Sequence, residues 1–184
     1  MLTLVVEDGT GKSDANSYAS RATGDAYFEG RLNAAAWTGA TEANREIALV
    51  MATRTIDSLF RFHGWKRVET QALQWPRIEV PDVDLPGGQV PGLRWSGCTY
   101  LPEDKVPVAV VNAACELALA LLAEDRSGDP EGAGLVSLGV TGAFSMVFDP
   151  TRPKPVVPRL VVGMLRRLGE YCGTGGGAVV LVRV

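Results

Sequence analysis

An almost uninterrupted apolar run from Val106 to Ala123 constrains the fold of this chain more than any other feature. Only Pro107, Asn112 and Glu116 interrupt it, and much of the remainder is alanine. The run is close to the ~20 residues that a bilayer requires. However, an acid at mid-span costs roughly 2.5–3.5 kcal/mol on insertion scales. We therefore predict no membrane span, and instead a helix from Asp104 to about Glu124 at the centre of the fold.

Asn112 and Glu116 are one helical turn apart, so both face the same side of this central helix. One interpretation is a hydrogen-bonded polar pair beside a loop. The alternative is a contact with another subunit.

Charge and cysteine content exclude several classes of protein. Lys and Arg number 18 against 21 Asp and Glu, a net charge of −3, whereas a general nucleic-acid binder carries a basic excess. Three scattered cysteines without a CxxC pair argue against a disulfide framework and fit a reducing cytoplasm. A single histidine, His63, leaves too few ligands for a zinc site of the usual spacing. A hydrophobic content of 46% argues against wholesale disorder.

Three more helices are predicted around this centre. Thr23 is expected to cap a short helix, and Thr41 to cap a longer one from Glu42 to about Phe60. A last helix, from about Pro158 to Tyr171, has an apolar stripe opposite an arginine-rich face, and Gly173 suits the position that ends it. The predicted fold class is therefore mainly α, a small helical bundle.

Two β elements are expected to accompany the bundle. Apolar and polar residues alternate over residues 135–148, which predicts a long β-ribbon or hairpin. A glycine-rich hinge leads into Ala178–Val184, a segment rich in β-branched residues and without an obvious partner strand. The chain thus divides into one helical domain, residues 1–172, and a hinge with an extended C-terminal strand arm, residues 173–184. Another chain is expected to cover the ribbon and to pair with the arm.

Residues 61–103 form a predicted loop that is rich in proline, glycine and tryptophan. Its apolar residues follow neither the helical nor the strand periodicity. So long a structureless stretch is unusual in a compact domain unless it serves a function or an interface. Its aromatic residues Trp65, Trp75 and Trp95 are interspersed with Arg61, Lys66, Arg67, Arg77 and Arg94. Such a mixture can stack bases and hold phosphates, or it can anchor a protein interface. Because the net charge is acidic, we favour the interface.

Ten residues of the loop, ribbon and arm are predicted to contact partner proteins. They are Trp75, Arg77, Phe144, Met146, Val179, Val180, Leu181, Val182, Arg183 and Val184.

The sequence contains no recognisable catalytic constellation. Gly11-Lys12-Ser13 resembles the end of a phosphate-binding loop, but Val6 stands where that motif needs its first glycine. His63 is the single histidine available as a base, and we interpret it as a packed side chain beside aromatic residues. We therefore expect no enzyme, no cofactor and no metal.

Several short motifs occur in a characteristic order. They are Ala15-Asn16-Ser17-Tyr18 with Ala26-Tyr27-Phe28, Arg31-Leu32-Asn33 with Ala36-Trp37 and the helical Ala52–Asp57, then Gln71-Ala72-Leu73-Gln74-Trp75-Pro76-Arg77, and finally Val106-Pro107. In this order they resemble the head–tail connector adaptor proteins of tailed bacteriophages, relatives of which are often labelled DnaT-like ssDNA-binding. The resemblance extends from about Asp14 to Glu124 and, more loosely, to the end of the chain.

The resemblance implies a structural protein of the virion neck, made in the host cytoplasm. Such a subunit forms a ring, typically of twelve copies, between the portal and a downstream neck, stopper or tail-completion protein. DNA passes through its bore without sequence-specific binding. The arm Val179–Val184 would then pair with the portal or an adjacent neck protein. The alternative function is an ssDNA-binding replication accessory protein, whose affinity for DNA would fall steeply with salt.

Overall fold

The computed structural model describes residues 2–82, 100–124, 126 and 155–173. This part holds five helices and four short strands, which confirms the mainly α fold class. The predicted ribbon, with Phe144 and Met146, and arm residues 174–184 lie outside the described residues. The helices are α1 (Arg21–Glu29), α2 (Ala35–Thr38), α3 (Glu42–Leu59), α4 (Val108–Ala123) and α5 (Arg159–Leu165), and the strands are β1 (Phe60–Phe62), β2 (Trp65–Lys66), β3 (Arg77–Ile78) and β4 (Gly169–Tyr171).

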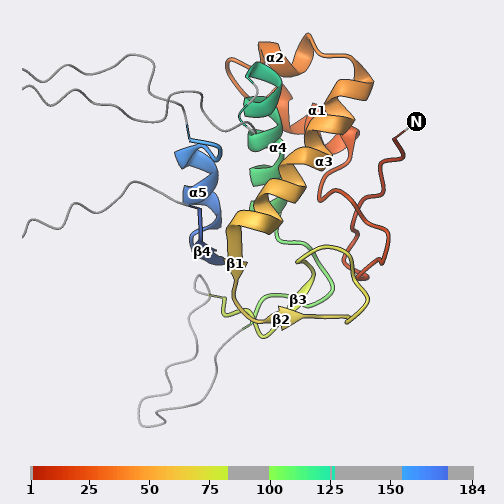
Figure 1. The fold of residues 1–184 in the computed structure, drawn as a ribbon, viewed down its shortest axis with the longest axis vertical. Coiled ribbons are helices and arrows are strands. Elements are labelled where there is room, and N and C mark those ends of the chain that lie inside the picture. The colour runs from red at the N-terminus through yellow and green to blue at the C-terminus, as the bar shows by residue number, and fades with distance from the viewer. Residues whose placement is uncertain (1, 83–99, 125, 127–154, 174–184) are drawn as a thin grey trace, which may run out of the picture.

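The predicted central helix is α4, which contacts α1, α2, α3 and α5 (Figure 1). It begins at Val108, later than the predicted Asp104, because Pro107 disfavours helical geometry in the residue before it. No helix among the described residues is long and apolar enough to cross a membrane. The buried residues of α4 lie on most of the circumference of the helix. They are Val110, Ala113, Ala114, Cys115, Glu116, Leu117, Ala118 and Leu119.

Side-chain caps set the starts of α1 and α3. The predicted cap of α3 is confirmed, because the Thr41 hydroxyl accepts the Asn44 N–H at 3.3 Å. The predicted start of α1 is wrong by three residues. Ser20, rather than Thr23, is the cap, and its hydroxyl accepts the Thr23 N–H at 3.0 Å.

The acid inside the central helix is neutralised by an arginine that follows α1. The Glu116 side chain is 5% exposed and accepts from the Arg31 Nε at 2.6 Å and Nη2 at 3.0 Å. The Tyr27 hydroxyl donates to the same carboxylate at 2.9 Å. Burial, and then this carboxylate, raise the pKa of Tyr27 to about 12. The pairing with Asn112 is thus corrected to an ion pair with Arg31, which joins the turn after α1 to α4.

The last predicted helix is only half helical. α5 ends at Leu165, and Gly169–Tyr171 instead forms β4, antiparallel to β1. At Gly169 a Cβ would lie 2.6 Å from the Arg61 carbonyl oxygen, so the close approach of the two strands requires glycine. Strand pairing of this kind depends on a distant segment, which the local apolar stripe does not reveal.

Candidate nucleic-acid interface

The stretch that lacks a sequence period, residues 61–103, is folded where the structure describes it. β1 pairs with β4, β2 pairs with β3, and Pro81 forms a bridge with Tyr100, all at the end of the molecule opposite α2 (Figure 1). The turn between β1 and β2 requires glycine, because Gly64 has a φ of +68° and a Cβ there would lie 2.1 Å from the Ile78 carbonyl oxygen. The prediction of a long loop is therefore corrected to short strands joined by tight turns.

The Arg77 guanidinium organises these turns from inside. Its Nε donates to the His63 carbonyl at 2.7 Å, and its Nη2 donates to the carbonyls of Gly64 at 2.6 Å and Phe62 at 3.3 Å. Its Nη1 donates to the backbone carbonyl and the side-chain oxygen of Gln74, at 3.1 and 3.0 Å. Arg77 is 7% exposed, and burial lowers the pKa of its guanidinium. It thus acts as a multiple hydrogen-bond donor to neutral oxygens.

Gln71 and Trp75 complete the same turn. The Gln71 amide donates to the carbonyls of Leu73 and Pro76, at 2.8 and 3.0 Å, and its oxygen accepts the Val68 N–H at 2.9 Å. Trp75 has 0% exposed surface, and its ring packs edge-on to Phe62.

Trp75 and Arg77 were both predicted to contact a partner, and the structure places both in the interior instead. The motif Gln71–Arg77 builds a turn on the chain's own core, so these two residues offer almost no exposed surface to a partner in this conformation.

Replacing Arg77 with lysine is expected to lower the free energy of unfolding by about 2–4 kcal/mol. Lysine keeps the charge but has at most three donors and no planar fork, so at least two buried carbonyls lose their partner. Urea unfolding measures the loss, with Arg67→Lys, an exposed arginine, as the matched control. Equal stability of the two variants would contradict this role for Arg77.

A half-buried acid of α3, Asp57, joins this turn to the helix. The Tyr18 hydroxyl donates to Asp57 Oδ1 at 2.5 Å, and the Gln74 N–H donates to Oδ2 at 2.9 Å. The Tyr18 hydroxyl in turn accepts the Trp75 N–H at 3.2 Å. Burial raises the pKa of Asp57 from its usual 3.8 to about 6, against the opposing effect of these hydrogen bonds.

This raised pKa predicts a pH dependence of stability. The folded chain keeps a proton on Asp57 that the unfolded chain releases, so the contribution is fully present below pH 3.8 and is lost as the pH rises through about 6. The difference in unfolding free energy between the native chain and Asp57→Asn is expected to shift by about 1 kcal/mol in favour of the native chain from pH 7 to pH 5. Urea titrations of both chains at several pH values measure it; a difference that does not vary with pH would contradict the assignment.

The outer surface of β2 is unlike the turn beneath it. Trp65 is 67% exposed, and Lys66 and Arg67 beside it are also exposed. Lys66 Nζ donates to the Gln71 carbonyl at 3.3 Å, and Arg67 Nη1 donates to the Gly9 carbonyl at 2.7 Å. Both of these acceptors are neutral, so the bonds orient the two cations without neutralising them. We call Trp65, Lys66 and Arg67 the hairpin patch.

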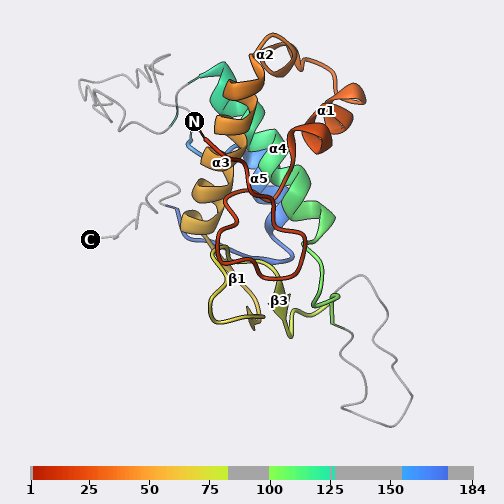
Figure 2. The same ribbon diagram turned by 90° about the vertical axis from the view of Figure 1, so that its right-hand side faces the viewer.

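An N-terminal loop contacts the hairpin patch through the Arg67–Gly9 hydrogen bond, and Figure 2 shows this loop above β1 and β3. Its amides converge on the buried Glu7 carboxylate, which accepts from the N–H groups of Gly9, Gly11 and Lys12 at 2.9, 2.9 and 2.8 Å. The amides of Gly11 and Lys12, in the segment that resembles a phosphate-binding loop, are therefore occupied by the protein's own carboxylate. The loop holds Arg67 through Gly9.

The segment that contains the hairpin patch is richer in basic residues than the chain as a whole. The chain as a whole carries −3, yet Phe60–Ile78 contains four Arg or Lys residues and one acid, Glu69. The structure separates the mixed aromatic and basic residues into two groups: Trp65, Arg61, Lys66 and Arg67 are exposed, and Trp75 and Arg77 are buried. Trp95 and Arg94 lie outside the described residues.

His63 is exposed, so its interpretation as a packed side chain is wrong. Along β1 and the residue after it, the buried Phe60 and Phe62 alternate with the exposed Arg61 and His63, as expected of a strand with one face on the core. The signal was present in the sequence as a short apolar–polar alternation ending at Gly64. Within the described ranges, no group of three His, Cys, Asp or Glu side chains is placed to hold a metal ion.

Comparison with known proteins adds one finding to this geometry. A family model described as "Putative DnaT-like ssDNA binding protein" matches residues 2–184. The chain belongs to this family. The DnaT-like label, which the sequence motifs suggested for relatives, is thereby confirmed over the whole chain. Neither the curated proteins nor the solved structures gave a match.

Within this DnaT-like chain, the hairpin patch combines an exposed indole with two exposed cations. Sequence reasoning found its residues but could not separate them from Trp75 and Arg77, because both groups lie in one aperiodic stretch.

Proposed function

We propose that this DnaT-like chain binds single-stranded DNA through the hairpin patch. The observation that carries the proposal is the 67% exposure of Trp65 beside two cations whose hydrogen-bond acceptors are neutral. An exposed indole is costly in water and provides a face on which an unpaired base can stack. Lys66 and Arg67 would then hold the phosphates on either side of that base.

Stacking also accounts for a preference for single strands. In a duplex both faces of each base are already covered, whereas an unpaired base can place one face on an indole. Stacking on an aromatic side chain contributes about 1–3 kcal/mol per base and tolerates any sequence. The proposed binding is therefore independent of sequence and sensitive to salt.

Replacing Trp65 with alanine is expected to weaken binding to a labelled oligothymidine about 5- to 150-fold, the equivalent of losing one stacked base. Fluorescence anisotropy at low salt measures the affinity. Trp65→Phe should retain most of it, and Leu32→Ala, which truncates an apolar side chain that is 83% exposed at another part of the surface, serves as the control. Unchanged affinity in Trp65→Ala would contradict the proposal.

A second candidate function is a head–tail adaptor of a tailed bacteriophage. The observation that favours it is the ordered set of motifs, from Ala15–Tyr18 to Val106-Pro107, which resembles those adaptors. In that function the chain assembles into a ring, typically of twelve copies, in the virion neck. It joins the portal to a downstream neck or tail-completion protein, and DNA passes through the bore. The arm Val179–Val184 pairs with a neighbouring protein, and the acidic net charge of −3 limits retention of the passing DNA.

One experiment separates the two functions. The purified protein is co-sedimented with DNA-filled, tail-less heads of its own phage in the presence of a labelled oligonucleotide. Saturable binding to heads at about a dozen copies, with loss of binding on deletion of residues 179–184, supports the adaptor. Binding to the oligonucleotide alone supports the single-stranded DNA function and contradicts the adaptor.

A further inference from the structure

The outward side of α5 carries two arginines separated by a glycine. Arg159, Gly163 and Arg166 follow one another at spacings of four and three residues, so they lie along one side of the helix, and all three are exposed. The opposite side is apolar, with Val161 and Leu165 buried in the core. We call Arg159, Gly163 and Arg166 the α5 stripe.

The stability of the helix does not explain two residues of the α5 stripe, Arg159 and Gly163. Arg159 occupies the first helical position, where the positive end of the helix dipole disfavours a cation. Gly163 lies inside the helix, where glycine costs about 1 kcal/mol relative to alanine. A Cβ at Gly163 would meet no heavy atom within 4 Å, so packing does not require glycine there either. Both residues suit a ligand that approaches from outside, because they combine positive charge with an uncovered backbone.

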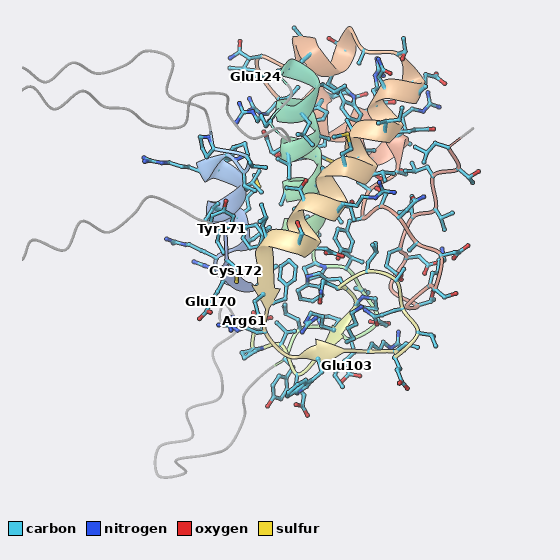
Figure 3. All side chains as sticks on the ribbon, viewed as in Figure 1. Arg61, Glu103, Glu124, Glu170, Tyr171 and Cys172 are labelled. Carbon is cyan, nitrogen blue, oxygen red and sulfur yellow. The ribbon has the colours of Figure 1, made fainter. Side chains whose placement is uncertain are left out.

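The α5 stripe is connected to the hairpin patch through β4 and β1. The Leu168 carbonyl, just after α5, accepts the His63 N–H at 2.9 Å, immediately before the turn into β2. Arg61 of β1 forms an exposed ion pair with Glu170 of β4, and Figure 3 shows this pair below α5. Exposed ion pairs contribute little to stability, so a phosphate can compete with Glu170 for Arg61. Exposed cations thus occur at α5, on β1 and on β2. The segment after α5 is hydrogen-bonded to the end of β1, and β1 continues through the Gly64 turn into β2.

We propose that the α5 stripe, with Arg61, binds the phosphates of the same DNA strand whose base stacks on Trp65. This inference rests on the proposed function and extends its binding surface beyond the hairpin. Arginine presents a planar fork of donors that matches a phosphate. Phosphate contacts position a strand without reading its sequence. DNA is favoured over an acidic protein as the ligand because β1, which carries Arg61, continues into β2, where an exposed indole lies beside two cations.

The salt dependence of binding tests this proposal. For a single strand, each phosphate contact contributes about 0.7 to the slope of log K against log salt concentration. The double variant Arg159→Gln/Arg166→Gln is therefore expected to reduce the magnitude of the slope by about 1.4 and to weaken binding at low salt. Trp65→Ala should weaken binding without changing the slope. Arg54→Gln, which removes an exposed arginine on α3, is the matched control, and circular dichroism verifies that each variant folds.

The outcomes separate this inference from the proposed function. If the α5 double variant has the same salt slope as the native chain and Trp65→Ala binds more weakly, the role of the α5 stripe is contradicted and the role of the hairpin patch is supported. A reduced slope combined with unchanged affinity in Trp65→Ala overturns the hairpin patch, and with it the strand that the two surfaces are proposed to share. Attachment to phage heads that is lost in the double variant while the DNA slope is native would assign the arginines to an acidic protein and overturn the inference. Absence of any binding to the oligonucleotide overturns both.

Discussion

Replacing Trp75 with alanine is expected to lower the free energy of unfolding by about 4 kcal/mol, close to the upper end for single core truncations. Trp75 is the point at which the turn of Gln71–Arg77 enters the core: it has 0% exposed surface and packs on Phe62, and its backbone N–H donates to Tyr18. Removal of the indole leaves a cavity that the short strands around it, fixed by Arg77, cannot close. Urea unfolding followed by far-UV circular dichroism measures the loss.

Two matched variants make this prediction specific. The indole Nε1 of Trp75 is buried without a hydrogen-bond partner among the described residues. Trp75→Phe removes that unpaired donor and keeps a ring against Phe62, so it should cost much less than alanine. Trp65→Ala removes an indole that is 67% exposed and should change stability by less than about 0.5 kcal/mol. Similar losses in Trp75→Ala and Trp65→Ala would show that Trp75 is not a core residue.

Replacing Arg31 with methionine is expected to cost about 3 kcal/mol of unfolding free energy at neutral pH. The substitution leaves the Glu116 carboxylate, which is 5% exposed, in an apolar helix without its cation. A buried charge that loses its partner typically costs 3–5 kcal/mol, and we take the lower end because the Arg31 side chain is 33% exposed. Arg21→Met removes a cation from the exposed pair with Glu42 and should cost less than about 1 kcal/mol.

A second substitution tests the cause. If the cost arises from the unpaired carboxylate, Arg31→Met/Glu116→Leu should be more stable than Arg31→Met alone, because the double variant replaces the charge with an apolar side chain. A double variant that is no more stable than the single one would show that Arg31 acts through its packing or through its bond to the Leu32 carbonyl.

The helices were predictable where the signal was local. Thr41 and the periodic residues after it predicted α3, and the apolar run predicted α4, because caps and buried faces are recorded within a few adjacent turns. β4 was missed because its partner, β1, lies more than a hundred residues earlier in the chain. The partner of Glu116 was missed for the same reason, since Arg31 reaches it from a distant turn.

The candidate interface was predictable in composition but not in arrangement. Sequence analysis identified a mixture of tryptophan and basic residues, and weighed it against a net charge of −3. Which residues of the mixture face water depends on the turn built by Arg77 and Gln71. The net charge describes the whole chain, whereas a ligand contacts only one part of its surface. Trp65 and Trp75 have similar neighbours in the sequence and opposite positions in the fold.

The burial of the turn Gln71–Arg77 has a consequence for how descent is inferred from sequence. Similarity in this motif indicates a shared scaffold, because the side chains of Gln71 and Arg77 hydrogen-bond to backbone carbonyls of the turn and its neighbours. The residues that we propose to contact a ligand, Trp65, Lys66 and Arg67, lie a few positions away, and substitutions there would leave that scaffold intact. Two proteins that share the turn can therefore share a fold while one binds a nucleic acid and the other connects a capsid to its tail.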